Sequence, residues 1–144
     1  MCILFVHSNI IQIVLFAYYF LLRAHTDGRV PCGVNPNIRL YRYEKKQRFG
    51  QHVDGSVGHL LKEGPHKGVT TVSDFTLLMY LNENIDGGET IFYGPSGDCC
   101  VNYKPKRGYA LLHGHGDRCL THEGGEVKKG TKYLLRSDVM YKDP

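Results

Sequence analysis

Three observations on the sequence predict a mainly β protein, built as an antiparallel sandwich or barrel. From Val34 onward, short apolar stretches are separated by Gly, Pro, Asn and Asp. No strong amphipathic helix lies between these stretches, which argues against parallel βαβ units. Glycine is frequent, with 17 residues in 144, as is typical of a turn-rich β protein.

The apolar stretches predict eight strands, and turn-forming residues separate most of them. The predicted strands are 38–43, 51–53, 75–81, 90–93, 99–103, 109–112, 119–122 and 132–141. The predicted turns are 86–88, 94–97, 106–108 and 124–125. The longest interval, 55–74, is polar and contains several glycines, and a loop of that length in a compact domain is usually functional or disordered.

The length and composition are those of one ordinary globular domain. Apolar residues make up 42% of the chain and charged residues 22%, so wholesale disorder is not expected. The formal net charge of +4 comes from Lys and Arg residues scattered through the turns rather than gathered on one helix or arm. A solvated surface of mixed charge explains this pattern, and nucleic-acid binding is not indicated.

Five cysteines are an odd number, and no two of them have Cys-x-x-Cys spacing. This excludes a zinc ribbon and a thioredoxin-type motif. We expect free thiols that are buried or half-buried. Cys99 and Cys100 are adjacent, so on a strand their side chains would point to opposite faces.

Residues 1–33 form an apolar N-terminal segment, and 34–144 carry the predicted domain. The stretch 10–22 is apolar except for Gln12, but a membrane span needs roughly 20 residues. A secretory signal is not indicated, because the basic start and the small-residue cleavage site are missing. Residues 1–22 have three interpretations: a weak signal anchor, a buried helix, or sequence that has replaced another N-terminus. The sequence leaves a cytoplasmic and an endomembrane location open, and a genuine anchor in residues 1–22 would associate the protein with an endomembrane.

The first candidate site is the triplet His52-Val53-Asp54. In an extended strand, residues i and i+2 project from the same face, so the imidazole and the carboxylate can meet one cation while Val53 faces away. A second imidazole from another strand would complete the two-His, one-carboxylate set of non-heme Fe(II) oxygenases. The triplet alone is weak evidence, because a surface turn also accounts for it.

The second candidate site is His122, which Lys132 follows ten residues later. A hairpin through Gly124 and Gly125 would return the chain and bring Lys132 near the metal pocket, where its ammonium could meet a carboxylate. Arg136 lies four residues further on, hence on the same face of the strand as Lys132. It is a rival or auxiliary anion partner, since a guanidinium suits bidentate carboxylate pairing better than an ammonium does.

Together these residues resemble the prolyl 4-hydroxylase-like branch of the Fe(II)/2-oxoglutarate-dependent dioxygenases. The resemblance spans roughly residues 35–141 and rests on three motifs in the right order. They are His52-x-Asp54, then Tyr80-Leu81-Asn82 with Gly87-Gly88-Glu89-Thr90, then His122-x-Gly124-x-x-Val127-x-x-Gly130-x-Lys132. The resemblance implies a double-stranded β-helix, or jelly-roll, core. Its N-terminal support is expected to be incomplete, because only residues 1–34 precede the first barrel strand.

The resemblance also implies the chemistry of the site. His52, Asp54 and His122 match the iron ligands, and Lys132 matches the residue that holds the distal carboxylate of 2-oxoglutarate. Fe²⁺, 2-oxoglutarate as cosubstrate and O₂ would hydroxylate an unactivated C–H bond with release of succinate and CO₂. Ascorbate would rescue oxidised iron.

Two tyrosines match positions that line the cosubstrate pocket in the family: Tyr43, nine residues before His52, and Tyr80. Ordinary strand packing accounts equally well for each of them. For 87–90 we prefer a tight turn that opens a strand, with Thr90 facing the pocket as the lesser alternative.

His113 and His115 are rivals to His122 as the third ligand, because His-x-His has the same spacing on one strand face. Neither has a basic residue downstream at the family spacing, so we favour His122. His115 is better explained as a turn residue near the site.

The family name suggests a prolyl residue in a peptide or protein as the substrate, lying across the barrel mouth under 55–74. One alternative is an AlkB-like demethylase of nucleic acid, which the lack of a clustered basic stripe argues against. The alternative from another class is a truncated, non-catalytic β-helix that binds a ligand or partner. This alternative is suggested by the short segment that precedes the first predicted barrel strand.

Overall fold

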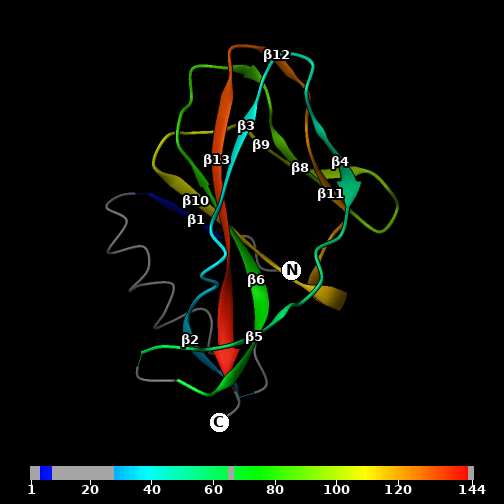
Figure 1. Cartoon of the computed structure of the whole chain (residues 1–144). Coiled ribbons are helices and arrows are strands. Elements are labelled where there is room, and N and C mark those ends of the chain that lie inside the picture. Colours follow the sequence, from blue (N-terminus) through cyan, green and yellow to red (C-terminus); the bar gives the residue numbers. More distant parts are fainter. Residues whose placement is uncertain (1–3, 8–27, 65–66, 143–144) are drawn as a thin grey trace.

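The computed structural model describes residues 4–7, 28–64 and 67–142, and most of this chain lies in two facing β-sheets (Figure 1). One turn of 3-10 helix, η3 (Gly116–Arg118), accompanies the strands. The strands are β1 (Leu4–His7), β2 (Val30–Val34), β3 (Arg39–Tyr43), β4 (Phe49–His52), β5 (Gly58–Leu60), β6 (Thr70–Tyr80), β7 (Asp86–Gly87), β8 (Thr90–Tyr93), β9 (Cys99–Tyr103), β10 (Tyr109–Gly114), β11 (His122–Gly124), β12 (Val127–Lys129) and β13 (Lys132–Lys142).

The larger sheet is organised around β6 and β13, which pair antiparallel along most of their length. Its strand order is β1-β10-β6-β13-β2, while β3 also pairs with β13 and β5 with β6. Because β13 is 11 residues long, one half pairs with β3 and the other half with β2. The half next to β3 contains Lys132 and Arg136, which places both residues on a central strand of this sheet.

The smaller sheet has the order β4-β11-β8-β9, so the short strand β11 is held from both sides. His122 on β11 lies opposite His52 on β4 and opposite Phe92 on β8. A separate two-stranded sheet joins β7 to β12. The pairing of β11 with β4 thus places the two histidines of the candidate site side by side.

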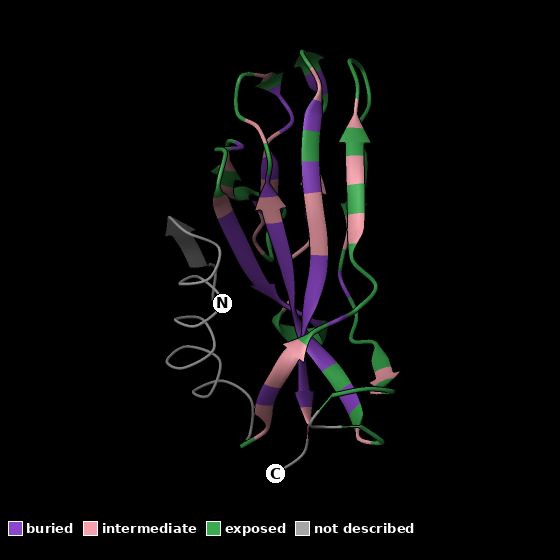
Figure 2. Cartoon of the chain, turned by 60° about the vertical axis from the view of Figure 1, so that its left-hand side comes forward, coloured by how far each residue is buried: buried purple, intermediate pink, exposed green. Residues whose placement is uncertain are grey.

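The core explains why the stretch around β6 reads as a continuous apolar run. Phe75 and Leu77 belong to one buried cluster, whereas Leu78 and Tyr80 belong to another that includes Phe92 of the smaller sheet. Successive side chains of a strand point to opposite faces, so a strand buried on both faces loses the apolar-polar alternation. Figure 2 shows the resulting buried stretch along the middle of the larger sheet.

The mainly β fold is confirmed, but several strand positions differ from the prediction. The predicted strand 119–122 is wrong, because 116–118 forms η3 and β11 begins only at His122. The predicted turn at 124–125 is wrong in part, since Gly124 ends β11 and the chain then forms β12 before β13. Strand periodicity cannot detect three-residue strands that depend on their neighbours for pairing.

The interval 55–74 is shorter as a loop than predicted, because β5 and the start of β6 occupy part of it. Strand β5 pairs with β6 at the margin of the sheet, with Gly58 opposite Val72 and Leu60 opposite Thr70. Strand β2 was not predicted because it contains Pro31 and Gly33. Proline is tolerated on an edge strand, and β2 pairs with β13 alone within the described residues.

The expectation of buried or half-buried thiols is wrong for Cys99 and Cys100, which are exposed on the edge strand β9. Cys32 and Cys119 are half-buried and carry free thiols, as expected. Most of the segment 1–22 lies outside the described residues. In the part of the chain that the structure describes, no helix has the length and apolar character of a membrane span.

Gly87 should be indispensable to the fold, because its backbone has a φ of +76° and a Cβ there would collide with Glu126 O. We expect Gly87→Ala to lower the free energy of unfolding by at least about 3 kcal/mol, measured by urea denaturation. Gly97 is the matched control, with a φ of +85° and open space around it. Gly97→Ala should cost only about 1–2 kcal/mol. Equal losses in the two variants would contradict the collision.

Candidate active site

The described residues contain a group that could hold a metal ion, formed by His52, Asp54 and His122, whose ligand atoms all lie within 4.8 Å of one another. His52 ends β4, and Asp54 follows two residues later. Nε2 of His52 lies 3.6 Å from Asp54 Oδ1, and Nε2 of His122 lies 3.8 Å from Asp54 Oδ2. The two imidazoles and the carboxylate therefore converge on one point.

Backbone carbonyls hold both imidazoles in one orientation. Nδ1 of His52 donates to Gly50 O at 2.8 Å, and Nδ1 of His122 donates to Leu120 O at 3.0 Å. A histidine whose Nδ1 carries the proton presents the lone pair of Nε2. Nε2 of His52 is buried and makes no hydrogen bond to a described residue, so it is available to a metal. Burial lowers the pKa of His122, which favours its neutral, ligating form.

Asp54 is ionised although it is only 6% exposed. Burial by itself would raise its pKa, but the hydrogen bond from Thr76 and the charge of Arg136 outweigh burial and lower the pKa to about 2. Thr76 Oγ1 donates to Asp54 Oδ2 at 2.6 Å, and Arg136 Nη2 lies 2.9 Å from Asp54 Oδ1. The carboxylate is thus charged and oriented over the ordinary pH range.

A chain of hydrogen bonds continues behind Asp54 through His115, the rival ligand. Since Thr76 donates its proton to Asp54, its oxygen accepts from Nε2 of His115 at 2.7 Å. Nδ1 of His115 then accepts from Ser73 Oγ at 3.1 Å. Both ring nitrogens of His115 are therefore engaged in positioning Asp54. The prediction that His115 is a turn residue near the site is confirmed, since it lies between the end of β10 and η3, and its side chain is buried.

The other rival, His113, lies at the end of β10 and is 3% exposed. Its Nε2 is 3.6 Å from Asp54 Oδ2, and its ring packs against that of His122 with centroids 4.5 Å apart. Burial and the neighbouring His122 lower the pKa of His113 to about 3, so this imidazole is neutral. Neither ring nitrogen makes a hydrogen bond within the described part of the chain.

Lys132 is a buried ammonium with little compensation from the protein. It is 3% exposed, and its only hydrogen bond to the described residues goes from Nζ to Gly88 O at 2.7 Å. Nζ also lies 5.8 Å from the ring centroids of Tyr43 and Tyr80. Burial lowers the pKa of Lys132 to about 8, against the opposing effect of Glu89. A buried cation with unused donors is suited to binding an anion.

One pocket connects the candidate metal ligands to Lys132. It encloses about 520 Å³, its open mouth included. The residues that line it come from both sheets: Tyr41, Tyr43, Phe49, His52, Asp54, Leu78, Thr90, His113, His122, Glu123, Gly124, Gly125, Lys132, Leu134 and Arg136. The structure therefore brings six of the seven predicted site residues into one pocket.

Tyr80, the seventh, lies behind the pocket wall, where its hydroxyl is 2.7 Å from Thr90 Oγ1. It supports Thr90, which lines the pocket. The alternative that Thr90 faces the pocket therefore describes the position of this residue. The tight turn also exists, with positive φ at Gly87 and Gly88. Gly88 contributes to the site as well, since its carbonyl accepts the hydrogen bond from Lys132.

Sequence reasoning missed Thr76, Phe92 and Cys119, which contact the candidate ligands from other strands and loops. Phe92 stacks on His122 with ring centroids 5.2 Å apart, and Cys119 Sγ accepts a hydrogen bond from the Asp54 backbone N–H at 3.1 Å. No local pattern marks these residues, apart from the polar Thr76 inside the apolar run of β6.

The sequence model of the 2OG-Fe(II) oxygenase superfamily matches residues 38–137, which is most of the chain. The chain belongs to this superfamily. Two curated relatives of this oxygenase domain are prolyl 4-hydroxylase 1 of Arabidopsis thaliana, 31% identical over 122 residues, and a PKHD-type hydroxylase of Crocosphaera subtropica, 29% identical over 99 residues. The matches cover 74% and 69% of the chain but only 41% and 40% of the relatives.

Solved structures of prolyl hydroxylases share the fold, which confirms the jelly-roll expectation. The 2OG complex of viral collagen prolyl hydroxylase from Paramecium Bursaria Chlorella virus-1 aligns with a TM-score of 0.60 at 20% identity, over 99% of this chain and 79% of that one. A Trichoplax adhaerens prolyl hydroxylase, in complex with a hypoxia inducible factor peptide fragment, aligns with a TM-score of 0.60 at 18% identity. That alignment covers 93% of this chain and 53% of that one.

Membership of this oxygenase superfamily implies Fe²⁺, 2-oxoglutarate and O₂, and the residues present fit these groups. Two imidazoles and one ionised carboxylate form the donor set of a non-heme Fe(II) site with open positions. The buried Nε2 of His52, which makes no hydrogen bond within the described part of the chain, would be satisfied by such an ion. Lys132 offers unused donors to a carboxylate elsewhere in the same pocket.

Thr76 should control metal affinity through Asp54. We expect Thr76→Val to weaken Fe²⁺ binding at least about 10-fold, because it leaves Asp54 Oδ2 without its donor and His115 without its acceptor. Anaerobic titration calorimetry measures the change. Thr76→Ser keeps the hydroxyl and should bind Fe²⁺ nearly as the parent protein does. Equal affinity in the Val and Ser variants would show that the hydrogen bond is unimportant.

Proposed function

We propose that this chain is an Fe(II)- and 2-oxoglutarate-dependent oxygenase that hydroxylates an unactivated C–H bond, with release of succinate and CO₂. The observation that carries the proposal is the convergence of His52, Asp54 and His122, with both imidazoles oriented by backbone carbonyls. Residues 34–144 would form the oxygenase domain. Bound iron would supply the oxidative chemistry, and the protein would supply orientation, charge and exclusion of water.

Lys132 would bind the distal carboxylate of 2-oxoglutarate. Gly124, two residues after His122, lies beside Lys132, since a Cβ at Gly124 would be 3.9 Å from Lys132 Nζ. The absence of a side chain there keeps the space between the histidine and the lysine open to a small, extended dicarboxylate. Tyr43 lines the same space and lies opposite Lys132 in the pairing of β3 with β13.

Arg136 would act mainly on Asp54 rather than as the principal anion partner. Its Nη2 lies 2.9 Å from Asp54 Oδ1, so the guanidinium already has a carboxylate partner. An arginine in this position keeps the aspartate ionised and would also attract an anionic cosubstrate to the metal end of the pocket. Lys132, which has no carboxylate in hydrogen-bond contact among the described residues, is the better candidate for the distal carboxylate.

A prolyl residue in a peptide or protein is the substrate we propose. The names of the relatives support this class, and one structural neighbour was solved with a peptide fragment. At the mouth of the pocket, Phe49 is 47% exposed and packs on His52 with ring centroids 4.3 Å apart. This ring offers an apolar surface next to the metal ligands, suited to a pyrrolidine ring. We also propose ascorbate as the reductant that restores Fe²⁺.

The purified chain with Fe²⁺, O₂ and 2-oxoglutarate should form succinate, faster with ascorbate and faster still with a proline-containing peptide. His52→Ala should abolish the product, because one metal ligand is lost. His122→Ala should abolish iron binding, whereas His115→Ala should retain measurable iron binding.

Two results would contradict the proposal. A folded, iron-loaded protein that forms no succinate would favour a non-catalytic binding module. Loss of iron binding in His115→Ala together with full binding in His122→Ala would move the third ligand to His115.

The binding of 2-oxoglutarate should weaken as the pH rises above about 8. The pKa of Lys132 is lowered by burial to about 8, so the ammonium is present below this pH and is progressively lost above it. The dissociation constant should rise by up to about tenfold per pH unit beyond that point. Titration calorimetry in iron-free protein measures it.

Lys132→Arg is the control, since a guanidinium stays charged across this range. Its affinity for 2-oxoglutarate should be weaker near neutral pH but flat with pH. A parent protein whose affinity is equally flat from pH 7 to 10 would exclude Lys132 as the titrating anion partner.

A further inference from the structure

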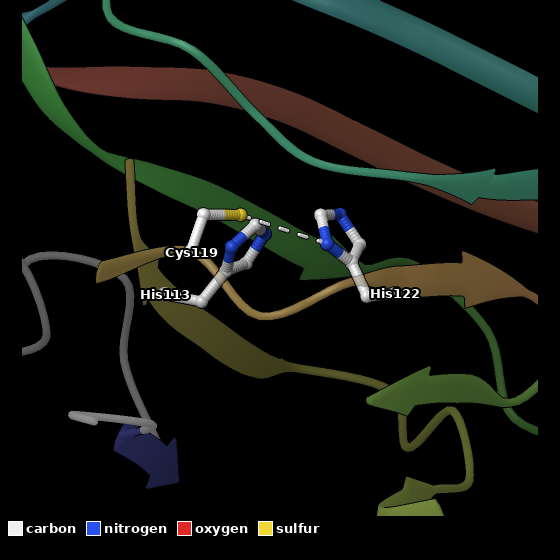
Figure 3. Close-up of side chains that lie close together, drawn as sticks. All are labelled: His113, Cys119 and His122. Carbon is white, nitrogen blue, oxygen red and sulfur yellow. Dashed lines mark hydrogen bonds between the residues drawn. The ribbon is translucent and has the colours of Figure 1, made fainter. Parts of the chain in front are cut away.

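A second group of metal-binding side chains overlaps the proposed iron site. His113, Cys119 and His122 each offer one ligand atom, and these atoms lie within 4.8 Å of one another. Figure 3 shows the three side chains converging, with the Cys119 sulfur directed toward the His122 ring. Sγ of Cys119 lies 3.8 Å from Nδ1 of His122, which is the nitrogen on the far side of the ring from the Nε2 that faces Asp54.

The environment of the His113 side chain indicates that this cluster binds a ligand. The side chain is 3% exposed, and neither ring nitrogen makes a hydrogen bond to a described residue. A buried imidazole without hydrogen bonds costs free energy, because both nitrogens are bonded to water in the unfolded chain. The triad of His52, Asp54 and His122 does not include His113. The proposed iron site therefore does not explain why this imidazole is buried without hydrogen bonds to the described residues.

The geometry and the donors suit a thiophilic ion. In tetrahedral zinc sites the bond lengths place a sulfur and a nitrogen ligand about 3.5 Å apart and two nitrogens about 3.3 Å apart. The separation of 3.8 Å between Cys119 Sγ and His122 Nδ1 is close to this value. Two imidazoles and a thiolate, with water as the fourth ligand, favour Zn²⁺ over Fe²⁺ because thiolate is a soft ligand. Metal binding itself removes the thiol proton.

We propose that His113, Cys119 and His122 form a second cation site, specific for Zn²⁺ or a similar thiophilic ion, that cannot be filled together with the iron site. The two sites exclude each other because they share His122. This mutual exclusion rests on the proposed iron ligands. Iron binding through Nε2 requires the proton on Nδ1, where it is donated to Leu120 O. A cation on Nδ1 moves the proton to Nε2, which then has no lone pair for iron.

The occupied second site would therefore hold the oxygenase in an iron-free, inactive form. Cys119 also accepts a hydrogen bond from the backbone N–H of Asp54, so a metal–thiolate bond at Sγ would act on the loop that carries a second iron ligand. The chain would thus respond to the ratio of zinc to iron.

Co²⁺ is the probe for the cluster, because a cobalt–thiolate bond gives a charge-transfer absorption in the near ultraviolet. Iron-free full-length protein titrated with Co²⁺ should show this band. Asp54→Ala and Asp54→Asn, which disable the iron triad, should keep the band. Cys119→Ser should lose it, and His113→Phe, which fills the same space without a ligand, should weaken Co²⁺ binding at least about 10-fold.

Cys99 and Cys100 supply the matched control, since both are exposed thiols outside the cluster. The double variant Cys99→Ser, Cys100→Ser should keep the band. Absence of the band in the parent protein, or its survival in Cys119→Ser, would overturn the proposal. Because the band is read in iron-free protein, its presence or absence is independent of whether the chain forms succinate.

Competition tests the exclusion separately. Anaerobic equilibrium dialysis with radioactive Fe²⁺ measures bound iron as Zn²⁺ is added. In Cys119→Ser, displacement of half the iron should require at least about 10-fold more Zn²⁺ than in the parent protein, because Zn²⁺ can then compete only at the triad. Equal Zn²⁺ requirements in the two proteins would overturn the exclusion.

Discussion

The backbone pairing of β11 with β4 is the interaction on which the candidate site depends. It is a short ladder, yet it sets His122 directly opposite His52, and a slip of β11 by one residue would turn the His122 imidazole away from His52. Strand β8 holds β11 from the other side and places Phe92 against His122. The two imidazoles are therefore positioned by sheet register and then oriented by the carbonyls of Gly50 and Leu120.

Two buried charged side chains, Asp54 and Lys132, give the pocket its polarity, and they differ in how many polar partners the protein provides. Asp54 accepts a hydrogen bond from the Thr76 hydroxyl and forms an ion pair with the Arg136 guanidinium, so it remains an anion. Lys132 has one carbonyl and the faces of two tyrosines, and its pKa is lowered. A pocket with one satisfied anion and one under-satisfied cation is prepared for a metal at one place and a carboxylate at another.

His122 contacts both candidate metal sites. One nitrogen faces Asp54, the other lies near Leu120 O and Cys119 Sγ, and the ring packs on Phe92 and His113. The position of its proton determines which nitrogen can bind a metal. A single tautomer change would thus convert one ligand set into another without moving the backbone.

The sequence by itself determined the strand-rich fold and the shared face of Lys132 and Arg136 on one strand. These follow from the two-residue period of a strand, which is local. Only the tertiary structure decided that His115 supports Asp54 through Thr76, that Arg136 pairs with Asp54, and that Cys119 adjoins His122. These contacts join strands far apart in the chain, and the register between such strands depends on packing and backbone pairing across the whole sheet rather than on any local pattern.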